Sequence, residues 1–333
     1  MFATQRVDPE HPALGATVAK IAAVAARVDE VVVLADGAVP GSLPDNVTVR
    51  TFGARSRLGR GAGYEVALAR ALRPRPLAVL AHMVPVFAVL AAPLTRTARV
   101  PLLLWYTHWR ATRTLRLAEL VCDGVVSVDG RSFPLPSHKV VATGHGIDVR
   151  RFRCGRVASG RRLLALGRYS PAKGLETIVR AVAAVPEAEL DVYGPTLTDE
   201  ERRHRGELEQ VVQDMGAGGR VRLRDAVPRS EVPQLLAAAD ALVNNMRAGA
   251  PDKVVYEAAA SCLPVLASNP VFDTLLPAQL RFERDDSAGL AERIRALPEL
   301  DPAIGTELRR RVEAEHSVDR WAERVLAAAS RVS

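Results

Sequence analysis

Residues 163–175, Leu-Leu-Ala-Leu-Gly-Arg-Tyr-Ser-Pro-Ala-Lys-Gly-Leu, decide the fold that this sequence predicts. The apolar run 163–166 is typical of a buried strand, and Ser170-Pro171 indicates a turn. A helix is then expected to begin at Gly174. A strand, a tight loop and a helix start in this order make an anion site, because free backbone N–H groups and the helix dipole both point into the loop. The alternative is an ordinary turn with solvated cations.

Two cations, Arg168 and Lys173, lie in this loop. The chain has 45 Lys and Arg residues, but lysine occurs only at positions 20, 139, 173 and 253. Arginine is therefore the usual cation of this chain, and a lysine in the loop stands out. We interpret Arg168 and Lys173 as candidate phosphate ligands.

Further motifs follow the loop in a fixed order. They are Leu190-Asp-Val-Tyr-Gly194 and then, within the run from Asp240 to Ser268, Tyr256-Glu257-Ala258 and Leu263-Pro264-Val265. In order and spacing they resemble the C-terminal domain of the retaining nucleotide-sugar glycosyltransferases of family four (glycosyltransferase group 1). In the first half of the chain, Thr107-His108 and Gly144-His-Gly-Ile-Asp148 also resemble that family. The resemblance therefore covers nearly the whole chain.

The resemblance implies an α/β protein of the GT-B fold, with two Rossmann-like doubly wound parallel-sheet domains that face a cleft. We expect an N-terminal acceptor-side domain over residues 1–152 and a C-terminal nucleotide-sugar-binding domain over residues 153–316, with a hinge at Arg153–Gly160. A C-terminal helix over residues 317–333 is expected to cross back to the first domain. A chain of 333 residues, 48% apolar, is long enough for two such domains.

The resemblance also implies donor-binding residues in the second domain. In the family, two glutamates eight positions apart bracket a loop and a helix start; the first approaches the sugar and the second hydrogen-bonds the ribose. Glu257 matches the second, but the first falls at Gly249, which leaves Asp252 as a nearby carboxylate that could substitute. The backbone amides from Gly249 to Lys253 are expected to face the diphosphate. A carboxylate near a helix start is also favoured by the dipole alone.

Three glycines complete the predicted donor site. Gly167 and Gly194 each follow a strand of the second domain. In the first domain, Gly15 is placed to face the donor phosphates or the acceptor. A plain lead-in to the first helix is the alternative for Gly15.

Two histidines follow strands of the first domain. The strand expected at 101–106 is followed by Thr107 and His108, and ligands of open α/β sheets collect at the carboxyl ends of strands. The resemblance places a histidine at this position near the reacting carbon of the sugar, although a polar strand cap is the alternative. His82 holds a similar position after an earlier strand and ranks second. The predicted catalytic residues are His108, Arg168 and Lys173.

The reaction that the resemblance implies moves a sugar from a nucleoside diphosphate, such as a UDP- or GDP-sugar, to an unknown hydroxyl acceptor with retention of configuration. Charged groups held in place before the reaction stabilise the leaving diphosphate. A metal-dependent transferase needs clustered carboxylates, and no Asp-x-Asp triplet occurs in the sequence, so we expect no metal and no cofactor. Because Gly249 lacks a side chain, two alternatives stay open: a GT-B epimerase or hydrolase, and a non-catalytic relative that binds nucleotide sugar.

The charge balance bears on partners and location. A net charge of +7 favours anionic partners. Nucleic acid is not expected, because the arginines are spread along the chain without interleaved aromatic residues. An anionic or lipid-linked acceptor fits, with peripheral contact to the inner face of the membrane. The three cysteines (Cys122, Cys154 and Cys262) are far apart, so neither a disulfide framework nor a zinc site is predicted, and a reducing cytoplasm fits best.

Three segments carry further structural expectations. Met1–Thr4 offers only a stub of a first strand, and Gly53–Gly63, rich in Arg and Gly, is expected to be a mobile basic loop. Pro76–Leu94 is nearly all apolar and close to the ~20 residues of a membrane span. Its internal His82 and Pro85 favour instead a buried strand, a loop and a buried helix.

Overall fold

The computed structural model of the chain describes residues 1–11, 14–155 and 161–332. The chain divides into two compact units, the first of Met1–Asp148 with Glu315–Ser333 and the second of Val149–Ala314. Positions 156–160 of the expected hinge lie outside the described residues. The first part of the first unit ends at Asp148, whereas the predicted domain boundary follows residue 152. Its second part begins at Glu315, whereas the predicted C-terminal segment begins at residue 317.

The first unit is built on a parallel sheet whose described strands run in the order β3-β2-β1-β4-β5-β6-β7. The strands are β1 (Phe2–Val7), β2 (Val31–Ala38), β3 (Val47–Thr51), β4 (Val79–His82), β5 (Leu102–Trp105), β6 (Gly124–Ser127) and β7 (Val140–Ala142). The expectation of a stub at the N-terminus is wrong. Strand β1 continues to Val7 because it lies in the middle of the sheet and pairs with β2 as far as Ala38.

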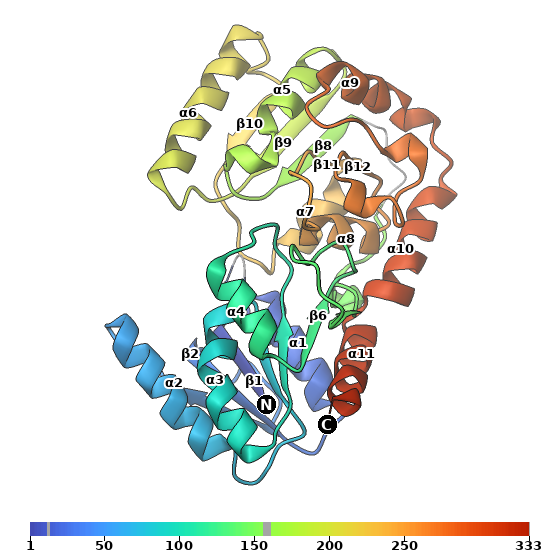
Figure 1. Ribbon diagram of the computed structural model, residues 1–333. Helices are drawn as coiled ribbons and strands as arrows, with labels where there is room; N and C mark the ends of the chain where they lie inside the picture. The colour runs from blue at the N-terminus through green and yellow to red at the C-terminus, as the bar shows by residue number, and fades with distance from the viewer. Residues whose placement is uncertain (12–13, 156–160, 333) are drawn as a thin grey trace. The chain divides into compact units, whose positions relative to one another are not determined.

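The helices of this unit are α1 (Ala16–Ala25), α2 (Arg57–Ala71), α3 (Pro85–Ala98), α4 (Arg113–Val121) and α11 (Val318–Arg331). Parallel strands are joined by right-handed crossovers, so a reversal of direction along the sheet puts the connecting helix on the other face. Accordingly α1 packs with α11, whereas α2, α3 and α4 pack side by side (Figure 1).

Helix α2 replaces the basic loop predicted at Gly53–Gly63. Ser56 is its N-cap and accepts a hydrogen bond from the N–H of Gly59 at 2.9 Å. Tyr64 and Leu68, four residues apart, are fully buried on one side of the helix. Burial of this apolar side outweighs the low helix propensity of the glycines, which was the reason for predicting a loop.

The apolar segment Pro76–Leu94 forms β4 and the first part of α3, with Pro85 at the start of the helix. This confirms the prediction of a buried strand, a loop and a helix. Within the described part of the chain, no helix is long and apolar enough to cross a membrane.

The C-terminal helix α11 is anchored in the first unit by Trp321. Its ring is fully buried and meets the ring of Trp105 edge-on, with centroids 5.6 Å apart. The ammonium of Lys20 on α1 lies 4.3 Å from the ring centroid of Trp105 and 5.1 Å from that of Trp321. Val325, one turn further along α11, is also buried.

The second unit has a parallel sheet in the order β10-β9-β8-β11-β12. Its strands are β8 (Arg162–Leu166), β9 (Glu189–Tyr193), β10 (Val221–Arg224), β11 (Ala241–Asn244) and β12 (Val265–Ala267). Its helices are α5 (Leu175–Ala183), α6 (Asp199–Asp214), α7 (Val232–Ala238), α8 (Lys253–Ala260), α9 (Ser287–Ala296) and α10 (Ala303–His316), the last of which ends beyond the unit boundary.

The strand order of the second unit reverses between β8 and β11. From β8 the chain first adds β9 and β10 on one side, then returns to add β11 and β12 on the other. Helices α5 and α6 pack together, and α8 contacts β11 and β12 (Figure 1). In open α/β sheets, ligands bind outside the carboxyl ends of the strands at such a switch point. The loops after β8 and β11 are therefore the part of this unit to inspect for a site.

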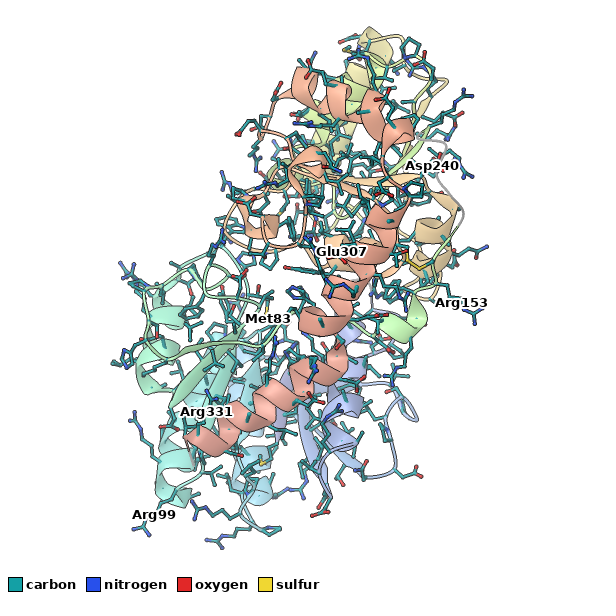
Figure 2. The ribbon with its side chains drawn as sticks, turned by 90° about the vertical axis from the view of Figure 1, so that its right-hand side faces the viewer. Met83, Arg99, Arg153, Asp240, Glu307 and Arg331 are labelled. Carbon is teal, nitrogen blue, oxygen red and sulfur yellow. A yellow bond between two sulfur atoms is a disulfide. The ribbon has the colours of Figure 1, made fainter. Side chains whose placement is uncertain are left out.

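One expectation about the cysteines is overturned. Cys154 and Cys262 form a disulfide across 108 positions of sequence, drawn as the yellow bond near the labelled Arg153 in Figure 2. It ties the first residues of the second unit to the end of α8. The prediction failed because a long sequence separation says nothing about distance in the fold. Cys122 is a free thiol and is buried in the first unit.

Candidate active site

The loop after β8 is shaped by two glycines. Gly167 has a backbone φ of +141°, and a β-carbon there would lie 2.6 Å from both Cε and Nζ of Lys173. Gly194 follows β9, and any side chain on it would collide with the carbonyl oxygen of Gly167. The two glycines thus let neighbouring backbones approach closely and leave space that the Lys173 ammonium occupies.

Lys173 meets two residues from the other side of the switch point. Its Nζ forms an ion pair with Oδ2 of Asp252, and the same oxygen accepts a hydrogen bond of 2.9 Å from Nδ2 of Asn244. The side chains of Lys173 and Asp252 are each 16% exposed. The loop after β8, the end of β11 and the start of α8 therefore converge on one charged centre.

Two helices begin beside this centre without a side-chain cap. Asp252 is the N-cap of α8, but its carboxylate accepts no hydrogen bond from the first turn of the helix. The N-cap of α5 is Gly174, with a φ of +57°, and it has no side chain to offer. The first N–H groups of both helices carry partial positive charge, and the N-cap side chain caps neither helix. This combination of cation and helix starts suits a bound anion.

Arg168 is the second cation of the loop. One guanidinium nitrogen lies 3.1 Å from Oε1 of Glu201, which is near the start of α6. The other carboxylate oxygen of Glu201 accepts a hydrogen bond of 2.7 Å from the N–H of Leu197. Glu201 is buried, whereas the Arg168 side chain is 53% exposed. The guanidinium is thus tethered to the unit and still accessible from solvent.

Glu257 lies in the middle of a buried ion-pair cluster on α8. Both of its carboxylate oxygens accept hydrogen bonds from the guanidinium of Arg229, and Nζ of Lys253 lies 3.5 Å from one of them. Burial by itself would raise the pKa of Glu257, but the charges of Lys253 and Arg229 outweigh it and hold the pKa below its usual range. Burial lowers the pKa of Lys253.

This geometry bears on the ribose contact predicted for Glu257. A ribose hydroxyl would have to share oxygens that Arg229 already engages, and the Glu257 side chain is 2% exposed. In the structure, Glu257 forms ion pairs with Arg229 and Lys253 inside the second unit. Its contact with a ribose remains a prediction.

Two predicted site residues, His108 and Gly15, belong to the first unit. Nδ1 of His108 accepts a hydrogen bond of 3.0 Å from the N–H of Arg110, so the neutral ring carries its proton on Nε2. The ring also stacks on Trp109 at 5.3 Å between centroids. Gly15 donates its N–H to the carbonyl of His11 at 2.9 Å and forms the N-cap of α1. Gly15 therefore lies at the start of a helix, and His108 lies beyond the end of β5.

His82, the second-ranked histidine, is enclosed in the core of the first unit. It is 4% exposed and packs between the rings of Phe2 and Trp105. Burial, aided by the nearby Lys20 charge, holds its pKa well below the usual range. This enclosed position indicates a core role for His82.

The second unit thus brings most of the predicted donor residues to one edge of its sheet, namely Gly167, Arg168, Lys173, Gly194, Gly249, Asp252, Lys253 and Glu257. Gly15 and His108 belong to the first unit. Among the residues that the structure describes, no three His, Cys, Asp or Glu side chains are grouped as metal ligands. The positive groups at this edge are side-chain cations and helix starts.

Sequence reasoning missed two residues of this edge. Asn244 ends β11 and is buried, and its amide holds Asp252 in place. Its position at the end of a strand was a usable signal. Arg229 follows β10 and is buried against Glu257. In a chain rich in arginine, nothing in the sequence marks Arg229 as different from its neighbours.

Comparisons with known proteins give a family match for part of the chain and a fold for nearly all of it. Residues 160–299 match the family model described as glycosyl transferases group 1. Over 99% of its length the chain superposes on 99% of Anabaena HepE in complex with UDP, with a TM-score of 0.80 and 17% identity. The chain has the GT-B fold. The matched residues contain the loop after β8 and all of α8.

Other solved structures share this fold. Sucrose-phosphate synthase from Thermosynechococcus elongatus is 18% identical, with coverage of 97% of this chain and 96% of that chain and a TM-score of 0.75. WaaG, a glycosyltransferase involved in lipopolysaccharide biosynthesis, is 15% identical, with 98% coverage of both chains and a TM-score of 0.67. No curated protein is significantly similar to the chain in sequence. At such identities the likeness concerns the fold.

Proposed function

We propose that this protein is a glycosyltransferase that moves a sugar from a nucleoside diphosphate sugar to a hydroxyl acceptor, with retention of configuration and without a metal ion. The observation that carries the proposal is the position of Lys173 beside the starts of α5 and α8, which no side chain caps. A diphosphate placed there would meet an ammonium and two sets of backbone N–H groups. These are the groups that a leaving diphosphate needs.

The chemistry follows from the leaving group. The bond between the anomeric carbon and the phosphate oxygen breaks, and the electron pair leaves with the diphosphate. The acceptor oxygen bonds to the same carbon from the side that the diphosphate leaves, and its proton passes to the departing phosphate oxygen. Lys173 and Arg168 offset the growing negative charge as fixed cations, which supports a reaction without a metal.

The remaining predicted residues take supporting roles in this proposal. Gly167, Gly194 and Gly249 allow the diphosphate to approach the backbone, and Lys253 adds a cation at the start of α8. Asp252 provides a carboxylate close to the position where the family has a sugar-binding glutamate. His108 is proposed to contact the transferred sugar, and Gly15 to face the donor or the acceptor.

UDP is our first choice of donor nucleotide. The structures of HepE are complexes with UDP, UDP with glucose, and UDP-glucose, and this support comes from a protein that shares the fold. GDP is the second choice. The sugar and the acceptor are left to experiment.

Thermal shift with a panel of nucleoside diphosphates tests the donor site. A ligand that binds the folded state raises its stability, so UDP or GDP is expected to raise the melting temperature. The Lys173→Ala variant is expected to lose the shift. Arg180→Ala serves as the control, because it removes one cation from the far end of α5 and is expected to keep the shift. An unchanged shift in Lys173→Ala would show that the phosphate site lies elsewhere.

Product analysis tests the reaction. With UDP- and GDP-sugars and a panel of hydroxyl acceptors, we expect transfer with the donor's anomeric configuration, seen by NMR, and equal rates with and without EDTA. Donor hydrolysis or epimerisation without transfer would support the alternative enzyme class. Tight donor binding with no turnover over the whole panel would support a non-catalytic relative.

The acceptor is proposed to be anionic or lipid-linked, at the cytoplasmic face of a membrane. Around α2 the first unit exposes arginines together with apolar side chains, with Leu58 88% and Val66 51% exposed (the exposed arginines are Arg55, Arg57, Arg70, Arg73 and Arg75). Such a surface favours anionic lipid headgroups. Co-sedimentation with phosphatidylglycerol vesicles but not with phosphatidylcholine vesicles is expected. The cytoplasmic location rests on the nucleotide-sugar donor, because the disulfide removes the argument from the cysteines.

A further inference from the structure

We propose that Asp252 competes with the donor's diphosphate for Lys173, so that its carboxylate returns to the ammonium after transfer and promotes release of the nucleoside diphosphate. The inference rests on the proposed function, because it needs a diphosphate at Lys173. The family's sugar-binding glutamate falls at Gly249, so the resemblance assigns no such role to Asp252.

The first argument is the cap that Asp252 does not make. Aspartate is among the preferred N-cap residues because its carboxylate accepts hydrogen bonds from the first N–H groups of a helix. Asp252 holds the N-cap position of α8, but its side chain turns to Lys173 and Asn244 instead. The start of α8 therefore stays open to another acceptor, and the carboxylate stays on the cation.

The second argument is the charge balance at Lys173. A largely buried ammonium needs a nearby negative charge, because leaving it uncompensated is strongly unfavourable. Among the described residues, Asp252 is the carboxylate within ion-pair distance of Lys173. A bound diphosphate supplies negative charge of its own, and two anions beside one cation repel each other. Asp252 thus stabilises the empty site and weakens the filled one.

The third argument is how Asp252 is held. Asn244 donates from Nδ2 to the same oxygen that Lys173 contacts, and its Oδ1 accepts a hydrogen bond of 3.3 Å from the N–H of Met246. The amide is buried and its orientation is fixed by the backbone. The carboxylate therefore remains close to Lys173 whether or not a ligand is present, which suits a competitor that must return quickly.

The consequence is kinetic. Differences in affinity between related complexes lie mostly in the dissociation rate, and product release limits the turnover of many enzymes. Without the Asp252 charge, the nucleoside diphosphate should bind more tightly and leave more slowly. Asp252 is in this sense a positioning residue that acts through Lys173.

The test measures UDP binding by calorimetry and UDP release by stopped-flow displacement. For Asp252→Asn we expect about tenfold tighter binding of UDP, with most of the change in the dissociation rate. Asp252→Ser, which also removes the charge, is expected to change both quantities in the same direction. Asp191→Asn is the matched control. It removes a carboxylate from β9 that pairs with Arg222 and Arg224, and UDP binding should stay unchanged.

The outcomes separate this inference from the proposed function. If wild type binds UDP, Lys173→Ala does not, and both Asp252 variants bind UDP equally or more weakly than wild type, the inference is overturned while the phosphate site stands. Circular dichroism shows whether each variant is folded. If wild type binds neither UDP nor GDP, or if Lys173→Ala binds as wild type does, the proposed function fails first.

Discussion

Gly194 lies so close to Gly167 that any side chain on Gly194 would collide with the Gly167 carbonyl oxygen. The contact joins the end of β9 to the start of the loop that carries Arg168 and Lys173. Because the added side chain would meet backbone atoms and not a flexible side chain, the surrounding structure has little room to adjust. The glycine is thus needed for the shape of the predicted phosphate loop.

The Gly194→Ala variant should therefore lose stability and donor binding together. Overpacking against backbone costs about 1–3 kcal/mol of unfolding free energy, and we expect the UDP-induced thermal shift to shrink as well. Urea unfolding and thermal shift measure the two effects. Gly206→Ala is the control, since a β-carbon there meets nothing within 4 Å. It lies inside α6 and should raise stability by about 0.5–1 kcal/mol. Equal stability of Gly194→Ala and wild type would contradict the crowded geometry.

Arg229→Ala should be among the most damaging changes in the second unit. It leaves the buried carboxylate of Glu257 without its bidentate partner, which costs about 3–5 kcal/mol. The comparison is Arg310→Ala, which breaks an exposed pair with Glu307 and should cost less than about 1 kcal/mol. Chemical unfolding of both variants checks the difference. Similar losses in the two variants would argue against a buried cluster around Glu257.

The stability of the first unit should fall in mild acid. Burial is the main cause that lowers the pKa of His316 to about 4, whereas an unfolded histidine titrates near 6.5. The unfolded state therefore binds more protons between these values, so stability is full above pH 6.5 and falls as the pH approaches 4. For His316 alone the loss at pH 5 is about 2 kcal/mol. His82, whose pKa burial also lowers, adds to it.

Unfolding of wild type and His316→Gln at two pH values measures this effect. The variant is expected to lose about 2 kcal/mol less than wild type between pH 7.5 and pH 5. His138→Gln, at an exposed position, is the control and should keep the wild-type dependence. A wild-type stability that is constant over this range would contradict the burial of the two histidines.

Reduction of the disulfide should destabilise the second unit. A link between Cys154 and Cys262 closes a loop of 108 positions, for which the chain-entropy account gives about 4–5 kcal/mol. Unfolding with and without dithiothreitol measures the change, and the Cys154→Ser, Cys262→Ser double variant should not respond to the reductant. Thiol titration of the oxidised, unfolded chain should find only Cys122. Three reactive thiols under these conditions would show that the bond is absent.

The sequence predicted the elements around the site well where the signal was local. The strand, turn and helix of residues 163–175 appear as β8, the turn at Ser170 and α5, because apolar runs and turn residues act over a few positions. Helix α2 was missed because its glycines suggested a loop, and only the burial of Tyr64 and Leu68 against the unit makes the helix favourable. The first strand was underestimated because its extent depends on its two neighbours in the sheet.

The candidate site shows the same division. Residue type and position after a strand were enough to select Arg168 and Lys173, whereas Asp252 and Glu257 were selected from the family resemblance. Their partners were not predictable, because Lys173 and Asp252 are 79 positions apart and Arg229 and Glu257 are 28 apart. No local pattern reports such pairings.

The sequence by itself determined most of the order of strands and helices in this protein, helix α2 excepted, and the kinds of side chain that follow each strand. Both depend on hydrophobic spacing and turn chemistry within short stretches. Tertiary structure alone decided that Asp252 leaves its helix uncapped to hold Lys173, that Glu257 is enclosed by Arg229, and that Cys154 meets Cys262. Parallel strands bring their carboxyl ends to one edge of the sheet, so residues far apart in the chain become neighbours there. Their opposite charges then form ion pairs.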